Sequence, residues 1–173
     1  QVQPLLRYIA DAAKQERPQE LCGFDCQFTA AASQTTLASD FQAFVQTLPD
    51  EPVYRDNGAT VMEVLGEPAQ SWSPPNDEEQ LRLLNAFQSL QDALKDAANS
   101  DADSASEREF WGQFLKSTAE YVKIVWSRSS MDPKRSVADM VNPRDAQMAD
   151  NMLWLALERY PDRKIIVWAA TMH

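Results

Sequence analysis

Apolar side chains recur at helical spacing over several stretches of this chain, which is the main signal for amphipathic helices. Pro4 suits a first helical position, and Pro18 lies where a helix cannot continue. Asn76 or Asp77 can cap the first of two long helices, whose apolar stripe runs from Leu83 to Leu94. The pattern predicts helices over residues 4–14, 34–48, about 77–98, 107–127 and 142–160.

Two stretches between these helices predict connections. Residues 49–77 hold five of the ten prolines and two of the four glycines, which predicts a loop with a short helix at 60–65. Residues 99–106 lack large apolar side chains, which predicts a solvated link with a tendency to disorder. The helices on either side of that link are expected to form an antiparallel hairpin over 76–128. Its aromatic stripe is more typical of core than of a ligand-binding wall.

Two short apolar segments predict β-strands. Residues 20–25 are bounded by turn signals, and residues 164–170 are apolar at successive positions, as in a strand covered on both faces. Such strands are typical of the parallel sheets of α/β proteins. The predicted fold class is therefore α/β: a mostly parallel sheet flanked by helices, with the long helical hairpin.

Composition narrows the class of partner. The chain has 173 residues, enough for a single domain over 1–173, and a formal net charge of −10. That charge argues against nucleic acid, because binding phosphates requires a basic face. No apolar run reaches the roughly 18 residues that a membrane span needs. The first residue is Gln1 rather than Met, which predicts a trimmed N-terminus; a cytoplasmic location is favoured, with export left open.

The two cysteines, Cys22 and Cys26, predict neither a disulfide nor a zinc site. On a strand their Cα atoms would be about 13 Å apart, too far for a disulfide bond. Two cysteines and a single histidine are too few for a structural zinc centre. Small buried apolar residues are the favoured interpretation, with a redox role as the alternative.

Three residues are candidates for chemistry at the carboxyl ends of the predicted strands, where open α/β sheets bind ligands. Asp25 ends one strand, and His173, the only histidine, follows the other. Both suit acid–base work, and Arg144, predicted in a first helical turn, can clamp an anion. Each has a plain alternative: a structural or exposed histidine, a turn-capping Asp25, and an Arg144 that is solvated or paired with Asp145.

The C-terminal stretch NPRDAQMADNMLWLALERYPDRKIIVWAATMH resembles the C-terminal signature of the erythromycin esterase family. Five residues match the helical part of that signature: Arg144, Asp145, Met148, Ala149 and Asn151. Six match its strand part: Lys164, Ile165, Val167, Trp168, Ala169 and His173. Upstream, Gly23, Phe24 and Asp25 resemble the end of another strand of the family. The two matches bracket nearly the whole chain.

The chain also departs from the family pattern. Ala170 and Thr171 stand where many members have His-Asn, and that earlier histidine is thought to take part in catalysis. The family's N-terminal Gly-Glu-x-x-His-Gly type of motif has no counterpart here. We therefore expect a fragment of a longer domain, inactive by itself.

The resemblance implies an enzyme that hydrolyses a carboxylic ester, in the best-known case a macrolide lactone in the response to an antibiotic. It implies His173 as the acid–base or water-orienting residue, Arg144 as the electrostatic stabiliser, Asp25 as a site-lining carboxylate, and Asp145 as a helix cap that orients Arg144. It implies no organic cofactor and leaves metal dependence open. The implied partner is a small ester or macrolide, with no nucleic acid, no membrane and no defined oligomeric state. Two alternatives remain: a non-macrolide ester from the cell envelope or a polysaccharide, and a non-catalytic binding module.

Overall fold

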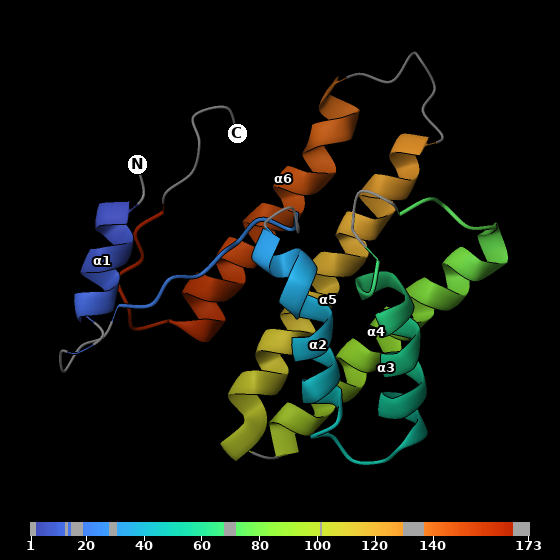
Figure 1. The fold of residues 1–173 in the computed structure, drawn as a ribbon, viewed down its shortest axis with the longest axis horizontal. Coiled ribbons are helices and arrows are strands. Elements are labelled where there is room, and N and C mark those ends of the chain that lie inside the picture. Colours follow the sequence, from blue (N-terminus) through green and yellow to red (C-terminus); the bar gives the residue numbers. More distant parts are fainter. Residues whose placement is uncertain are drawn as a thin grey trace.

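The structure, a computed structural model, describes residues 3–12, 14, 19–27, 31–67, 72–100, 102–129 and 137–167. Figure 1 shows how their helical elements are arranged. They are α1 (Gln3–Ala12), α2 (Ala31–Val45), α3 (Pro52–Leu65), α4 (Asp77–Ser100), α5 (Ala102–Ser129), α6 (Val137–Trp154) and the π-helical turn η2 (Leu155–Arg159).

The predicted α/β class is wrong, because the described part of the chain is helical and contains no strand and no sheet. Residues 19–27 and 164–167, both within the predicted strands or next to them, have no regular secondary structure. A strand exists only when a neighbouring strand satisfies its N–H and C=O groups, and an apolar run alone does not supply that neighbour. Ile166, predicted to be buried in a sheet, is 94% exposed.

The core lies between α2, α3, α4 and α5. The apolar stripe predicted for α4 faces inward, and Phe87, Leu90 and Leu94 are completely buried. Phe41 and Phe44 of α2 close over this stripe together with α5. Figure 1 shows α2 and α3 stacked over the α4–α5 pair, while α1 lies at the edge of the molecule, away from this core.

The two longest helices pack against each other along their length, and α5 then packs against α6. Residues 99–106 are not the polar link that composition predicted: α4 continues to Ser100, and α5 already begins at Ala102. Arg108 of α5 donates to the carbonyl oxygen of Ala97 at 3.0 Å, in the last turn of α4, where a cation complements the helix dipole. Local polarity therefore did not prevent helix formation.

Most aromatic residues of α5 pack in the core, as the structural interpretation of their stripe predicted, although Phe110 is 48% exposed. The Trp111 ring is stacked on Phe44 at a centroid distance of 5.2 Å and is tilted against Phe41 at 5.4 Å. Phe114 meets the same ring edge-on at 5.2 Å. Offset and edge-to-face arrangements are the favourable geometries for aromatic rings. Trp111 thus joins α2 to α5.

Helix α3 lies where a loop with only a short helix at 60–65 was expected. The proline-rich composition was misleading, because Pro52 occupies the first turn of α3, where its missing N–H costs nothing. Gly58 allows a close approach to α2: a Cβ atom there would lie 3.0 Å from Cγ1 of Val45. A proline in the first turn and a glycine at a helix crossing are both compatible with a helix, although composition alone predicts a loop.

The start of α6 also differs from the prediction. Asn142 and Pro143 were expected to begin the helix, but α6 begins at Val137, and Pro143 lies inside it. A proline there removes one intrahelical hydrogen bond. As a result Arg144 and Asp145 belong to the body of the helix, and Asp145 does not cap its first turn.

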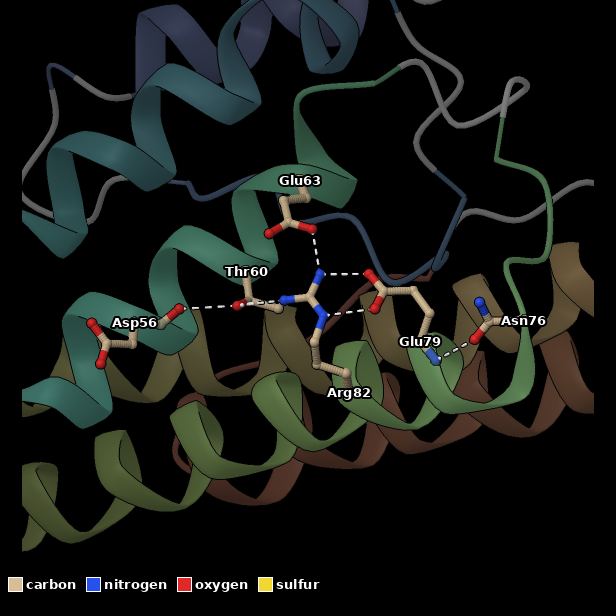
Figure 2. A network of polar contacts seen from close by, with 6 residues as sticks. All are labelled: Asp56, Thr60, Glu63, Asn76, Glu79 and Arg82. Carbon is tan, nitrogen blue, oxygen red and sulfur yellow. Dashed lines mark hydrogen bonds and ion pairs between the residues drawn. The ribbon is translucent and has the colours of Figure 1, made fainter.

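A network of charged side chains ties α3 to α4 (Figure 2). Arg82 contacts Glu63 of α3 at 2.5 Å and Glu79 of its own helix at 2.6 Å. Its Nη1 also donates to Thr60 at 3.1 Å. The hydrogen bonds to Glu79 and then Glu63 raise the pKa of Arg82, and the bond from Arg82 lowers the pKa of Glu79. Because the one guanidinium bonds to a carboxylate on each of the two helices, the network is a structural link between α3 and α4.

Replacing Asn76 by alanine is expected to lower the free energy of unfolding by about 1 kcal/mol. The Asn76 side-chain oxygen accepts from the Glu79 backbone N–H at 2.9 Å, which confirms the predicted cap of α4 (Figure 2). Urea unfolding followed by circular dichroism measures the effect. Asn85→Ala is the matched control, because Asn85 is exposed within the same helix, where alanine is the better helix former. Equal destabilisation by both variants would contradict the capping role.

Candidate functional site

Arg144 and Asp25 lie together although 119 residues separate them in the sequence. Arg144 projects from α6, and Asp25 belongs to the extended segment 19–27. Arg144 Nε donates to Asp25 Oδ1 at 3.1 Å, and Nη2 donates to Oδ2, so the contact is bidentate. The Arg144 side chain is 19% exposed and the Asp25 side chain 38% exposed. The pair is therefore anchored in the protein yet reachable from solvent.

The electrostatics of this pair favour a charged guanidinium. The hydrogen bond to Asp25 raises the pKa of Arg144, partial burial opposes that rise, and the charges of Asp25 and Asp145 add to it. The Asp25 carboxylate also accepts the backbone N–H of Gln27 at 3.1 Å, which is the turn-capping role foreseen as an alternative for it. Asp25 thus orients the guanidinium and closes its own turn at the same time.

Asp145 does not have the role that its motif suggested. Its Oδ1 is buried and has no hydrogen-bond partner among the described residues. The guanidinium of Arg144 is bonded by Asp25 instead. The structure therefore corrects the assignment of Asp145 as the helix cap.

A buried amide cluster, which no sequence pattern predicted, lies between α5, α6 and segment 19–27. Its centre is Asn151, two helical turns after Arg144. Asn151 Nδ2 donates to the carbonyl oxygen of Phe24 at 2.9 Å, immediately before Asp25 in the chain. Asn151 was noted only as a residue of the family signature. Nothing in its spacing indicates that its partners come from two other elements.

Beside this cluster, Asp150 joins α6 to α5. Lys116 Nζ lies 2.8 Å from the Asp150 carboxylate, and Gln113 Nε2 donates to Oδ2 at 3.0 Å. Burial by itself would raise the pKa of Asp150, but the hydrogen bonds from Lys116 and Gln113 outweigh it and lower that pKa. Asp150 therefore helps to hold α6, and with it Arg144, against α5.

A third contact holds the beginning of the extended segment. Tyr160, which follows η2, donates its hydroxyl to Glu20 Oε2 at 2.5 Å, and Arg163 donates to Glu20 Oε1 at 2.6 Å. The Cys22 Sγ atom lies 3.7 Å from the hydroxyl oxygen of Tyr160. Cys22 is exposed, contrary to the buried role expected for both cysteines, whereas Cys26 is buried.

The phenol of Tyr160 is expected to titrate near pH 12. The hydrogen bond to Glu20, followed by burial, raises its pKa from 10.0 to about 12. A raised pKa means that the associated stabilisation is complete below pH 10 and is lost as the pH rises towards 12. Carbon-13 NMR of labelled tyrosine measures the midpoint, and Glu20→Gln is expected to lower it. Glu51→Gln is the control; an unchanged Tyr160 midpoint in Glu20→Gln would refute the assignment.

The structure describes two of the three predicted site residues. Arg144 and Asp25 meet, but at a contact between a helix and an extended segment rather than at a sheet edge. His173, Ala170 and Thr171 lie outside the described residues. In the part of the chain that is described, no group of three or more His, Cys, Asp or Glu side chains is arranged to hold a metal ion. Among the same residues, none of the helices has the length and apolar character to cross a bilayer.

The described residues form an all-helical core, and a bidentate arginine–carboxylate pair lies beside it. The family model of erythromycin esterase matches residues 1–173 of the chain. The protein therefore belongs to the erythromycin esterase family, as its Arg144 and Asp25 motifs indicated. No curated protein and no solved structure gives a significant match.

Proposed function

We propose that this protein is an ester hydrolase in which the Arg144–Asp25 pair lies at the reacting group. The observation that carries the proposal is the bidentate contact between these two residues from opposite ends of the chain. Membership of the erythromycin esterase family supports the reaction class. A charged, half-buried arginine that is oriented by a carboxylate is suited to meet the negative charge that develops on a carbonyl oxygen.

In this mechanism water attacks the acyl carbon of the ester, and a base removes a proton from that water. His173 is the proposed base, because histidine titrates close to neutral pH. Arg144 donates hydrogen bonds to the oxyanion of the tetrahedral intermediate, while Asp25 keeps its guanidinium in place. The intermediate collapses, the imidazolium returns the proton to the leaving alkoxide, and the products are an acid and an alcohol. In a lactone both groups remain on one molecule.

The substrate we favour is a carboxylic ester other than a macrolide. Ala170 and Thr171 stand where many members of the family have His-Asn, which weighs against macrolide cleavage. Esters of the cell envelope or of a polysaccharide are the proposed class. A binding module on a degenerate scaffold is the second candidate, and the same two replacements are the observation that favours it.

The test is hydrolysis by the intact gene product, with erythromycin and a panel of acetyl and longer-chain esters followed by mass spectrometry. We expect turnover of at least one ester and a fall of roughly 10²- to 10⁴-fold in His173→Asn, the range for loss of a general base. Met172→Leu, one residue away, is the matched control and is expected to keep its activity.

The outcomes separate the candidates. Macrolide cleavage would contradict the substrate preference but keep the esterase. Full activity in His173→Asn would remove that residue from the chemistry. Absence of turnover together with measurable binding of an ester would favour the binding module.

A further inference from the structure

The side chain of Asn151 is buried, only 7% exposed, and uses both ends of its carboxamide. Its Nδ2 donates to the Phe24 carbonyl at 2.9 Å and to Ser117 Oγ at 3.0 Å. Its Oδ1 accepts from Gln113 Nε2 at 2.8 Å and from Gln147 Nε2 at 2.9 Å. Two donors and two acceptor lone pairs are the full capacity of an asparagine amide. The orientation of the Asn151 side chain is therefore determined by all four partners.

One of these partners belongs to the candidate site. The Phe24 carbonyl directly precedes Asp25, and Asp25 contacts Arg144. Arg144 and Asn151 are seven residues apart on α6, which places them on one face of the helix, about two turns from each other. That face thus holds two consecutive residues of the extended segment, one through its backbone and one through its side chain.

The relative strength of these two contacts decides which one positions Asp25. The Asp25 side chain is 38% exposed, and ion pairs that solvent reaches contribute little to ordering a chain. The Asn151 side chain is buried and its bond to the Phe24 carbonyl is partly buried, so loss of that bond leaves a carbonyl that solvent reaches only in part, which is costly. In the described residues, segment 19–27 also lacks a neighbouring strand to hold its backbone. The amide of Asn151 supplies the bond that a sheet would otherwise provide.

We infer that Asn151 is a positioning residue: its buried carboxamide fixes the backbone of Phe24 and thereby sets the Asp25 carboxylate against Arg144. The effect on positioning follows from the contacts alone. The effect on catalysis rests on the proposed function.

Asn151→Asp in the intact protein is the primary variant. It preserves the shape of the side chain but replaces the donor to Phe24 by an oxygen. Ser117→Ala is the matched control, because it removes another acceptor of the same amide and leaves the Phe24 bond intact. Gln147→Met removes one donor that orients Asn151 and serves as the second variant if Asn151→Asp does not fold.

The first readout is solvent exchange of the Arg144 Nε–H proton, measured by NMR and compared with the unfolding midpoint of each variant. We expect exchange to be faster by roughly tenfold in Asn151→Asp, by a smaller factor in Gln147→Met, and by less than about twofold in Ser117→Ala. The second readout is ester hydrolysis, in which Asn151→Asp is expected to lower kcat and leave KM within about twofold.

Exchange in Asn151→Asp that stays within about twofold of the wild type would overturn the inference. Equal acceleration in Asn151→Asp and Ser117→Ala would also overturn it, because it would show a general loosening of the cluster. If Asn151→Asp does not fold, unchanged exchange in Gln147→Met has the same meaning. A wild-type protein that hydrolyses no ester defeats the proposed function only, since the exchange comparison still decides the role of Asn151.

Discussion

Leu90→Ala is expected to lower the free energy of unfolding by about 2–5 kcal/mol. Leu90 is completely buried in the α2–α5 core, so truncation removes apolar contacts and leaves a cavity among rigid neighbours. For a chain of 173 residues this corresponds to a lower Tm by on the order of 10 °C. Thermal and urea unfolding followed by circular dichroism measure both quantities.

Leu81→Ala provides a control with the same change of side chain in the same helix. Leu81 is 61% exposed, so its truncation should change the free energy of unfolding by no more than roughly 0.5 kcal/mol. A much larger loss of unfolding free energy in Leu90→Ala than in Leu81→Ala would confirm that the Leu90 face of α4 is buried in the core. Similar effects at both positions would show that α4 packs with a different face inward.

Arg144→Leu is expected to reduce kcat for ester hydrolysis by roughly 10²- to 10³-fold, the range for loss of one oxyanion donor. Arg144→Lys is expected to recover only part of the activity, because an ammonium group cannot reproduce the bidentate contact with Asp25. The measurement is steady-state kinetics on the best ester of the panel. Arg55→Leu is the control, since Arg55 is an exposed arginine that is also paired with carboxylates, Asp50 and Asp56, but is remote in the sequence from Arg144.

The double variant tests whether Arg144 and Asp25 act as one unit. Asp25→Asn alone is expected to lower kcat less than Arg144→Leu does, and the combination should be no worse than Arg144→Leu, because cooperating residues are not additive. The free energy of unfolding should change by about 1 kcal/mol or less, as the pair is partly exposed. Multiplicative losses would show that the two residues act independently.

Several elements could be predicted because their signals are local. The cap at Asn76 and the stripe that includes Leu90 depend only on spacing within α4, and both are found as predicted. Pro143 shows the limit of such rules: its motif is typical of a helix start, yet the helix begins earlier. The rule describes a preference of a few tenths to a few kcal/mol, which packing and neighbouring turns can outweigh.

The proximity of Asp25 and Arg144 was predicted, but from a geometry that the described residues do not have. Asp25 and Arg144 were selected because strands of an expected sheet would bring them together. They meet instead because segment 19–27 lies along α6 and is held there by Tyr160, Asn151 and Arg144 itself. The family signature pointed to two residues that are in contact, whereas the inferred geometry around them was incorrect.

By itself the sequence determined the apolar faces of the long helices, the cap of α4, the family and the candidate residues Arg144 and Asp25. Only the tertiary structure decided that segments 19–27 and 164–167 form no strand in the described chain, that α3 is a full helix, and that Asn151 connects α5, α6 and the backbone next to Asp25. The physical reason is the range of the interactions. Side-chain periodicity and capping act over a few neighbouring residues, while a strand or a buried amide requires partners that only the folded chain brings near.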